Sequence, residues 1–359
     1  MSLAAIDRNA DRRIRVMIVD DSAVVRGLTR RWLEAETGIE IVRVCVDGEQ
    51  AVRDVAAAQP DVVLLDIEMP RLDGLSTLPL LRQAAPGARV IMASTLTGPG
   101  ATATVRALQL GAADCIAKPS ATGLAAADDY RRDLVAKIHA LGKARPVTSH
   151  ARSTPVTLRS PPTARVKPSA LVVAASTGGP QALQTFLSPI ARRISAPILI
   201  VQHMPATFIP IFANRLTEAL GKPCRLPVDG EEISAGAMFI APGDQHMRIA
   251  RSGGGLVIRL DRGEPVNFCR PAADPLFESA AVAFGSRLLA VVLTGMGQDG
   301  KGGCAKIVEA GGHVAVQDEA SSVVWGMPGS VALAGYAEAV KPLVELSSLT
   351  LNLMNGDAA

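Results

Sequence analysis

Short apolar runs alternate with amphipathic stretches of about ten residues through the first 140 positions. Helical periodicity follows each run, and Ser22 is a candidate N-cap for the first helix. The pattern predicts strands at residues 14–19, 39–45, 62–66, 89–94 and 114–117. Helices are predicted at 22–36, at 48–58, from 74 onward, at 102–110 and at 128–141. This alternation is typical of a parallel sheet that helices cover on both faces.

The alternation stops at residues 141–168, which are rich in Pro, Ser, Thr and Arg and indicate a flexible linker. It resumes at Ser169 with an apolar run at 170–175. Further strands are predicted at 197–202 and 288–294, helices at 180–187, 208–219, 274–284 and from about 300, and a glycine-turned hairpin within 243–260. The second half is therefore expected to be a doubly wound, mostly parallel α/β sheet with an antiparallel hairpin.

The length of 359 residues also favours two cores over one. We expect a domain at 12–140, the linker at 141–168 and a second domain at 169–352. The polar ends at 1–11 and 353–359 are expected to be a disordered extension and a tail.

Composition narrows the functional classes. The linker carries six Lys or Arg residues and no acid, so the net charge of +3 belongs to the linker and not to a folded basic face. Aromatic residues make up only 3% of the chain, which argues against base stacking, and we expect no nucleic-acid partner. The five cysteines are scattered, which favours reduced thiols in a cytoplasmic protein. No apolar run has the length of a signal peptide or a membrane span, so no membrane insertion is expected.

Acidic residues follow two strands of the first domain. Asp20 and Asp21 end the first strand and Asp66 ends the third, while Ser94 and Lys118 follow the fourth and fifth. Strand carboxyl ends share one edge of a parallel sheet, so three carboxylates would repel there without a cation, and Mg²⁺ suits such oxygen ligands. Asp66 could then accept a phosphoryl group whose oxygens Ser94 and Lys118 hold. Taken singly, each Asp could equally be a helix cap or turn former.

The ordered motifs DD, LLDIEMPRLDGL, ASTLT and KPS make residues 14–120 similar to a response-regulator receiver domain. The resemblance implies a flavodoxin-like (βα)5 fold with Asp66 as phosphoacceptor. It also implies Mg²⁺ held by Asp20, Asp21, Asp66 and the carbonyl of Glu68. Receivers often have an aromatic residue three positions before the lysine, where this chain has Cys115, so the way this receiver reports its state is open.

The second domain begins with LVVAASTGGPQAL, in which Ser176 stands between a strand and a helix. Such a turn can be structural, can bind phosphate, or can present a nucleophile. The spacing G-x-G-x-x-G and the P-loop Gly-Lys-Ser/Thr are both absent, which weakens the two phosphate alternatives.

The position of Ser176 relative to other strand ends favours the role of a nucleophile. His203 ends the strand at 197–202, and Asp299 lies in the loop after the strand at 288–294. If the three strands are neighbours, Ser176, a base and an orienting carboxylate meet at one edge, and amides of the glycine-rich turn face the serine oxygen. His203 could instead be a strand-end hydrogen bonder, the role that we expect for His246 and His313 over catalysis, and Asp299 could merely cap a helix. The elbow G-x-S-x-G of common esterases is absent.

Six motifs occur in register along the second domain: ASTGGPQAL, VQHMPATF, APGDQHM, PVNFCRPAAD, LTGMGQDG and QDEASSVVWGMPG. With the receiver and linker, residues 12–350 resemble the CheB family of chemotaxis response-regulator methylesterases. The resemblance implies hydrolysis of glutamate γ-methyl esters on chemoreceptors with release of methanol, and in many members deamidation of receptor glutamines. It implies a chemotaxis histidine kinase as phosphodonor and no cofactor for the esterase reaction.

The resemblance assigns site residues position by position. Ser176 is the nucleophile, His203 the general base and acid, and Asp299 the orienting carboxylate. The amides of Thr177 and Met296 are expected oxyanion donors, and Asn267 and Arg270 are expected to shape the cleft. One departure is RPAAD, where the family more often has RPS, so Ala272 removes a hydroxyl and is expected to affect local hydrogen bonding or substrate preference.

In the cycle that the resemblance implies, the unphosphorylated receiver packs over the cleft, and phosphorylation of Asp66 loosens this arrangement. Two rival classes stay open from the residues alone. A receiver joined to a DNA-binding output would have a short helical or winged-helix second domain with a basic face. A signalling scaffold would keep the fold without the chemistry.

Overall fold

The structure is a computed structural model, and it describes residues 12–95, 98–118, 124–143, 156–160 and 166–357. The chain divides into two compact units, Met1–Pro146 and Val147–Ala359. The predicted extension at 1–11, most of the predicted linker, and residues 358–359 lie outside the described residues. In the part that is described, no helix has the length and apolar character needed to cross a membrane.

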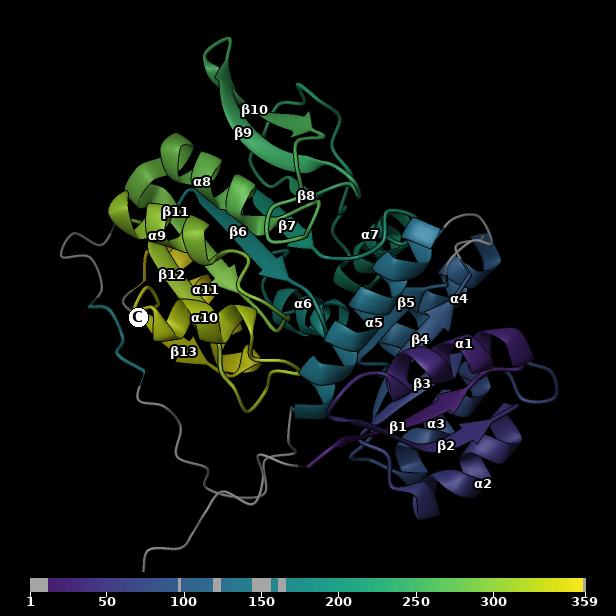
Figure 1. Cartoon of the computed structure of the whole chain (residues 1–359). Coiled ribbons are helices and arrows are strands. Elements are labelled where there is room, and N and C mark those ends of the chain that lie inside the picture. The colour runs from purple at the N-terminus through teal and green to yellow at the C-terminus, as the bar shows by residue number, and fades with distance from the viewer. Residues whose placement is uncertain (1–11, 96–97, 119–123, 144–155, 161–165, 358–359) are drawn as a thin grey trace, which may run out of the picture. The chain divides into compact units, whose positions relative to one another are not determined.

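The N-terminal unit is one parallel sheet in the order β2-β1-β3-β4-β5. Its strands are β1 (Ile14–Val19), β2 (Ile39–Cys45), β3 (Val62–Asp66), β4 (Arg89–Ser94) and β5 (Asp114–Ala117). Its helices are α1 (Ala23–Glu34), α2 (Gly48–Ala58), α3 (Gly74–Ala84), α4 (Gly98–Gln109) and α5 (Leu124–Lys143) (Figure 1). Ser22 caps α1 by accepting from the Val25 amide, as predicted.

The C-terminal unit is a six-stranded parallel sheet in the order β13-β12-β11-β6-β7-β8, with a separate antiparallel hairpin β9-β10 (Figure 1). Its strands are β6 (Ala170–Ala175), β7 (Ile198–Gln202), β8 (Met238–Ile240), β9 (His246–Ser252), β10 (Gly255–Asp261), β11 (Leu288–Val292), β12 (His313–Gln317) and β13 (Ala339–Lys341). Its α-helices are α6 (Gly179–Leu187), α7 (Ile209–Leu220), α8 (Ala273–Phe284), α9 (Lys301–Glu309), α10 (Met327–Leu333) and α11 (Leu343–Asn355). The predicted fold class is confirmed in both units.

The centre of this sheet carries the candidate chemistry. β6 lies between β7 and β11, so the three strands expected to deliver Ser176, His203 and Asp299 are neighbours. Side chains of β6 and β11 form one core with α8, α9 and α10. A large parallel sheet of this kind excludes the short helical or winged-helix output of the DNA-binding alternative.

Several elements were not predicted. β8 and β13 are only three residues long, too short to show a period of two, and β12, α10 and α11 were also missed. The predicted flexible linker needs a correction as well, because part of it is anchored to the C-terminal unit. Val156 packs against the core of that unit, and the Arg159 amide donates to the Ala337 carbonyl at 2.9 Å.

The predicted tail from residue 353 was also wrong. Helix α11 continues to Asn355, because Leu353 and Met354 are buried although the letters around them are polar. Gly356 ends the helix in the left-handed conformation, at φ +83°.

We expect a chain truncated after Asn352 to lose about 2–4 kcal/mol of unfolding free energy from the C-terminal unit, because two buried apolar side chains are removed. Urea unfolding followed by Trp325 fluorescence in a Trp32→Phe background measures this. Truncation after Asp357 is the matched control, since it keeps the whole helix. Equal midpoints for the two truncations would contradict the packing role of these residues.

Candidate active site and candidate phosphorylation site

The turn after β6 holds Ser176 in a fixed, half-buried position. The Ser176 amide donates to the Thr294 carbonyl at 3.0 Å, and the Gly179 amide donates to the Ser176 carbonyl at 2.7 Å. Gly178 has φ +76°, and a Cβ there would lie 2.6 Å from the Val323 side chain. The glycines therefore let the chain turn sharply from β6 into α6 while Ser176 keeps access to solvent.

Gln202 ties this turn to His203. Its Nε2 donates to the Ser176 and His203 carbonyls, both at 2.9 Å, and the side chain is 1% exposed. Our sequence interpretation missed this residue, although a glutamine directly after an apolar strand and before His203 was the available signal. Gln202 sets the spacing between the two loops from which Ser176 and His203 project.

The structure brings His203 and Asp299 together. The His203 Nε2 lies 2.8 Å from the Asp299 Oδ2, and the two side chains are 11% and 2% exposed. Burial alone would raise the pKa of Asp299, but the hydrogen bond and charge of His203 and two backbone amides lower it below its ordinary value. Asp299 is thus kept ionised, the state in which it orients an imidazole.

The start of helix α8 supplies those amides. Ala273 N and Asp274 N donate to the Asp299 carboxylate at 2.5 and 3.2 Å, so a residue distant in sequence takes the place of a helix cap. Asn267 Nδ2 donates to Asp299 Oδ1 at 3.1 Å and to Asp274 Oδ2 at 2.9 Å. Asn267, expected to shape the cleft, is therefore placed to hold the orienting carboxylate.

This arrangement explains the departure at Ala272, which is the N-cap of α8 and has no capping side chain. A hydroxyl at position 272 would accept from the backbone amide of the second or third helix residue, Asp274 or Pro275. Pro275 has no amide hydrogen to donate. Only the Asp274 amide would remain, and it already donates to Asp299. With alanine at position 272, no side-chain hydroxyl competes with the Asp299 carboxylate for the Asp274 amide.

The second ring nitrogen of His203 faces a cysteine. The Nδ1 lies 3.5 Å from Cys269 Sγ. Within the described residues, the His203 ring has two hydrogen-bond partners, Asp299 and Cys269. Ser176 is therefore not hydrogen-bonded to His203 in this structure. Burial lowers the pKa of His203, but Cys269 and Asp299 outweigh it and raise the pKa above its ordinary value.

The loop after β11 passes directly against Ser176. A Cβ on Gly295 would lie 2.8 Å from the Ser176 Cβ and 3.1 Å from its amide nitrogen. Thr177 follows Ser176, and Met296 follows Gly295, so the two expected oxyanion amides belong to the two loops that meet at the serine. Arg270 instead pairs with Asp244 at 2.6 Å and donates to the Gly263 carbonyl, which makes it a brace between loops.

His246 and His313 have structural partners, as expected. His246 Nε2 lies 3.0 Å from the Glu264 carbonyl, and its Nδ1 accepts from the Ala272 amide at 3.2 Å. His313 Nδ1 lies 2.9 Å from Glu338.

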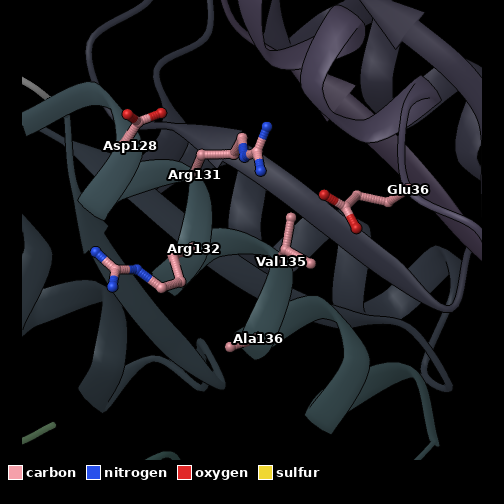
Figure 2. A pocket seen from close by; sticks show the side chains of 6 residues that line it. All are labelled: Glu36, Asp128, Arg131, Arg132, Val135 and Ala136. Carbon is pink, nitrogen blue, oxygen red and sulfur yellow. The ribbon is translucent and has the colours of Figure 1, made fainter. Parts of the chain in front are cut away.

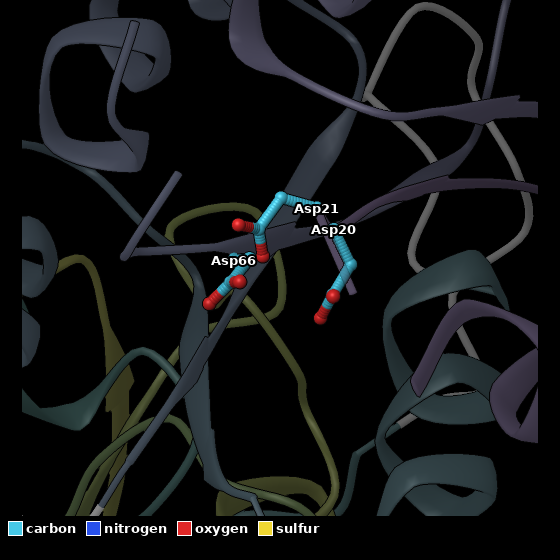
Figure 3. Close-up of side chains that lie close together, drawn as sticks. All are labelled: Asp20, Asp21 and Asp66. Carbon is cyan, nitrogen blue, oxygen red and sulfur yellow. The ribbon is translucent and has the colours of Figure 1, made fainter. Parts of the chain in front are cut away.

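In the N-terminal unit, the acidic cluster forms as predicted (Figure 3). Carboxylate oxygens of Asp20, Asp21 and Asp66 all lie within 4.8 Å of one another. Lys118 Nζ contacts Asp20 Oδ2 and Asp66 Oδ2, both at 2.7 Å. One ammonium against three carboxylates leaves net negative charge, and this set of hard oxygen donors fits a divalent cation such as Mg²⁺.

Asp66 itself is buried at the end of β3. Burial raises its pKa to about 6, and the hydrogen bond and charge of Lys118 limit the rise. The Glu68 amide donates weakly to Asp66 Oδ1 at 3.4 Å, which places Glu68 at the same strand end. Ser94 is buried, and its hydroxyl donates to the Thr95 and Gly100 carbonyls at 2.9 and 3.2 Å.

A separate pocket of about 510 Å³ lies on the N-terminal unit, along α5 and opposite Glu36 (Figure 2). Its lining also includes Asp128, Arg131, Arg132, Val135 and Ala136. None of these residues belongs to either candidate site.

Comparisons with known proteins agree with both units. Residues 16–127 match the family model of the response regulator receiver domain, and residues 171–349 match that of CheB methylesterase. "Protein-glutamate methylesterase/protein-glutamine glutaminase 2" of Caulobacter vibrioides is 54% identical over 337 residues, 93% of this chain and 96% of the relative. The protein-glutamate methylesterase/protein-glutamine glutaminase of Nitrobacter hamburgensis is 48% identical, over 99% of this chain and 98% of the relative. The Thermotoga maritima CheB methylesterase catalytic domain aligns over 52% of this chain and 100% of its own, with 37% identity and a TM-score of 0.51.

We expect Gly295→Ala to lower the unfolding free energy of the C-terminal unit by about 1–3 kcal/mol, because the new methyl carbon would lie too close to the Met327 sulfur and to the Ser176 side chain and backbone. Urea unfolding measures the change. Gly255→Ala is the control, since a Cβ there meets only ordinary contacts, the nearest at 3.6 Å. A Gly295→Ala protein as stable as this control would show that the two loops are not in close contact.

Proposed function

The chain belongs to the family of CheB methylesterases with an N-terminal receiver domain, and on that premise we propose that it is a phosphorylation-activated protein-glutamate methylesterase. Its substrates in this proposal are glutamate γ-methyl esters on chemoreceptors, and the product alcohol is methanol. The observation that carries the proposal is the His203–Asp299 hydrogen bond at the strand edge that also presents Ser176.

In the proposed reaction, the Ser176 hydroxyl attacks the ester carbonyl and His203 takes its proton. The tetrahedral intermediate expels methoxide, which His203 protonates to methanol, and an acyl-serine remains. Water then attacks the acyl-serine with His203 again as base, which frees the glutamate carboxylate and restores Ser176. Asp299 orients the ring, and the amides of Thr177 and Met296 are the proposed donors to the oxyanion.

The same steps accommodate a glutamine side chain. Ammonia then leaves in place of methanol, and the acyl-serine and its hydrolysis are unchanged. We therefore include deamidation of receptor glutamines as a second activity, supported by the double designation of the two relatives.

The contact between Cys269 and His203 Nδ1 has to break during catalysis. His203 Nε2 is occupied by Asp299, so Nδ1 is the nitrogen left to accept the Ser176 proton, and Cys269 Sγ faces it in this structure. We propose that the ring releases Cys269 when the substrate brings Ser176 into reach.

The receiver unit supplies the switch. Asp66 is the proposed phosphoacceptor, and a histidine kinase of a chemosensory pathway is the proposed phosphodonor. Asp20, Asp21, Asp66 and the Glu68 carbonyl would hold Mg²⁺, which when bound would neutralise charge on the incoming phosphoryl oxygens. Lys118 and Ser94 are the proposed partners of those oxygens, and phosphorylation would relieve a restraint that the receiver exerts on the esterase. The proposed compartment is the cytoplasm.

Methanol release from methyl-labelled receptor membranes, with and without a small phosphodonor, tests the function. We expect Ser176→Ala to abolish release, since the nucleophile is gone, and Asp299→Asn to lower it about 10⁴-fold. Asp66→Ala should keep the basal rate and lose the response to the phosphodonor.

Two results would count against the proposal. Equal release from the wild-type protein and from Ser176→Ala would leave the scaffold alternative in its place. Full phosphodonor activation of Asp66→Ala would remove the assigned phosphorylation site while leaving the esterase intact.

The pH dependence should report the environment of His203. A general base must be neutral, so kcat/KM should rise with pH through the His203 pKa, which lies above its ordinary value because of Cys269 and Asp299. Cys269→Ala removes one of these raising influences, so this limb should move to lower pH by about 0.4–1.1 units, the equivalent of one ordinary hydrogen bond. Cys224→Ala, at a buried thiol elsewhere in the same unit, should leave the limb in place. A shift to higher pH would mean that the Cys269 thiol donates to the neutral ring instead.

A further inference from the structure

A two-residue turn lies beside the candidate triad. Val266 and Cys269 exchange two backbone hydrogen bonds, of 3.1 and 2.9 Å, and so enclose Asn267 and Phe268. Both enclosed residues are left-handed, with φ of +52° and +63°. This is the backbone of a type I′ hairpin turn, in which Asn commonly precedes Gly.

Phenylalanine is a poor residue for the second position of this turn. A bulky side chain at positive φ is a rare outlier, and glycine would adopt the conformation without strain. Packing does not account for Phe268 either, because its side chain is 95% exposed. The ten other aromatic residues of the chain are all buried or half-buried. Backbone strain that neither packing nor turn chemistry explains is a reason to look for a function.

The two residues that flank Phe268 both contact residues of the candidate triad. On one side, Asn267 donates to Asp299 at 3.1 Å. On the other side, Cys269 Sγ lies 3.5 Å from His203 Nδ1. The turn therefore directs two side chains inward to the residues of the candidate triad and leaves the third, Phe268, in solvent at the margin of the site.

Other apolar side chains adjoin the same residues. Met204 follows His203 and Met296 follows Gly295, the glycine that abuts Ser176, and both methionines are partly accessible. Three loops thus each place one accessible apolar residue next to a triad member or its direct contact. Methionine and aromatic side chains are well suited to bind a protein surface there.

We propose that Phe268 is a substrate-specificity residue, which packs against apolar side chains of the receptor next to the esterified glutamate. The inference rests on the proposed methylesterase function and adds the way in which a protein substrate is held. Burial of the exposed ring on binding would supply affinity, and the chemical step would still depend on Ser176, His203 and Asp299.

The test is Phe268→Gly in the full-length chain, assayed as methanol release over a range of methylated receptor concentrations with the phosphodonor present. We expect KM to rise about tenfold or more and kcat to stay within about twofold, because the residue lost contacts substrate and not the reacting atoms. The melting temperature should be equal or higher, since glycine fits the turn. Phe268→Asn also tolerates positive φ but keeps a side chain on the turn. It should raise KM to the same extent, which separates loss of the phenyl ring from loosening of the loop by glycine.

Val282→Ala is the matched control. Val282 is 85% exposed on α8, the helix whose first amides hold Asp299, and its loss should change neither KM nor kcat. Unchanged kinetics in both Phe268 variants would overturn the proposal, and so would a fall in kcat at constant KM, which would assign Phe268 to the support of Asn267 and Cys269. Either result, with methanol release by the wild-type protein intact, would leave the proposed function standing.

Discussion

The arrangement of the C-terminal unit depends on one buried carboxylate. Asp299 is 2% exposed, and an ion so far from water is tolerated only when several donors replace its hydration. Those donors come from three places: His203 beyond β7, Asn267 in the turn at 266–269, and two amides at the start of α8. Each segment must be in register for Asp299 to stay ionised. The need to stabilise this charge therefore fixes the loops that would carry out catalysis.

The receiver unit meets the same physical problem and resolves it differently. Asp66 is also buried, but its donors are fewer, and Lys118 has to serve both Asp66 and Asp20. The pKa of Asp66 is accordingly raised to about 6, whereas that of Asp299 is lowered. Asp299 is fully compensated and suited to a fixed orienting role. Asp66 lies in an under-compensated cluster, where a cation or a change in its own charge alters the balance, and this is the physical requirement of a switch.

The sequence predicted the parts of this structure that follow from regular patterns. The strands at 14–19, 62–66 and 89–94 were placed with correct bounds, because short, mostly apolar runs between turn residues have few other interpretations. The meeting of His203 with Asp299 followed from the order β7-β6-β11, since parallel neighbours end at one edge. The strands β8 and β13 were missed because each has only three residues, and their strand conformation depends on pairing with the longer β7 and β12. The end of α11 was missed because burial of Leu353 depends on distant partners.

Side-chain contacts between loops were beyond prediction for a related reason. The motif PVNFCRP shows Asn267 and Cys269 two positions apart, but only the left-handed turn directs both to the His203–Asp299 pair. A glycine in place of Phe268 would satisfy that backbone better, so the local and the functional demands on this position differ. Natural sequences depart from local preference mainly where a site requires it. The positive φ and the exposure of Phe268 are therefore the local features that motivate the substrate-binding role proposed for it beside the candidate triad.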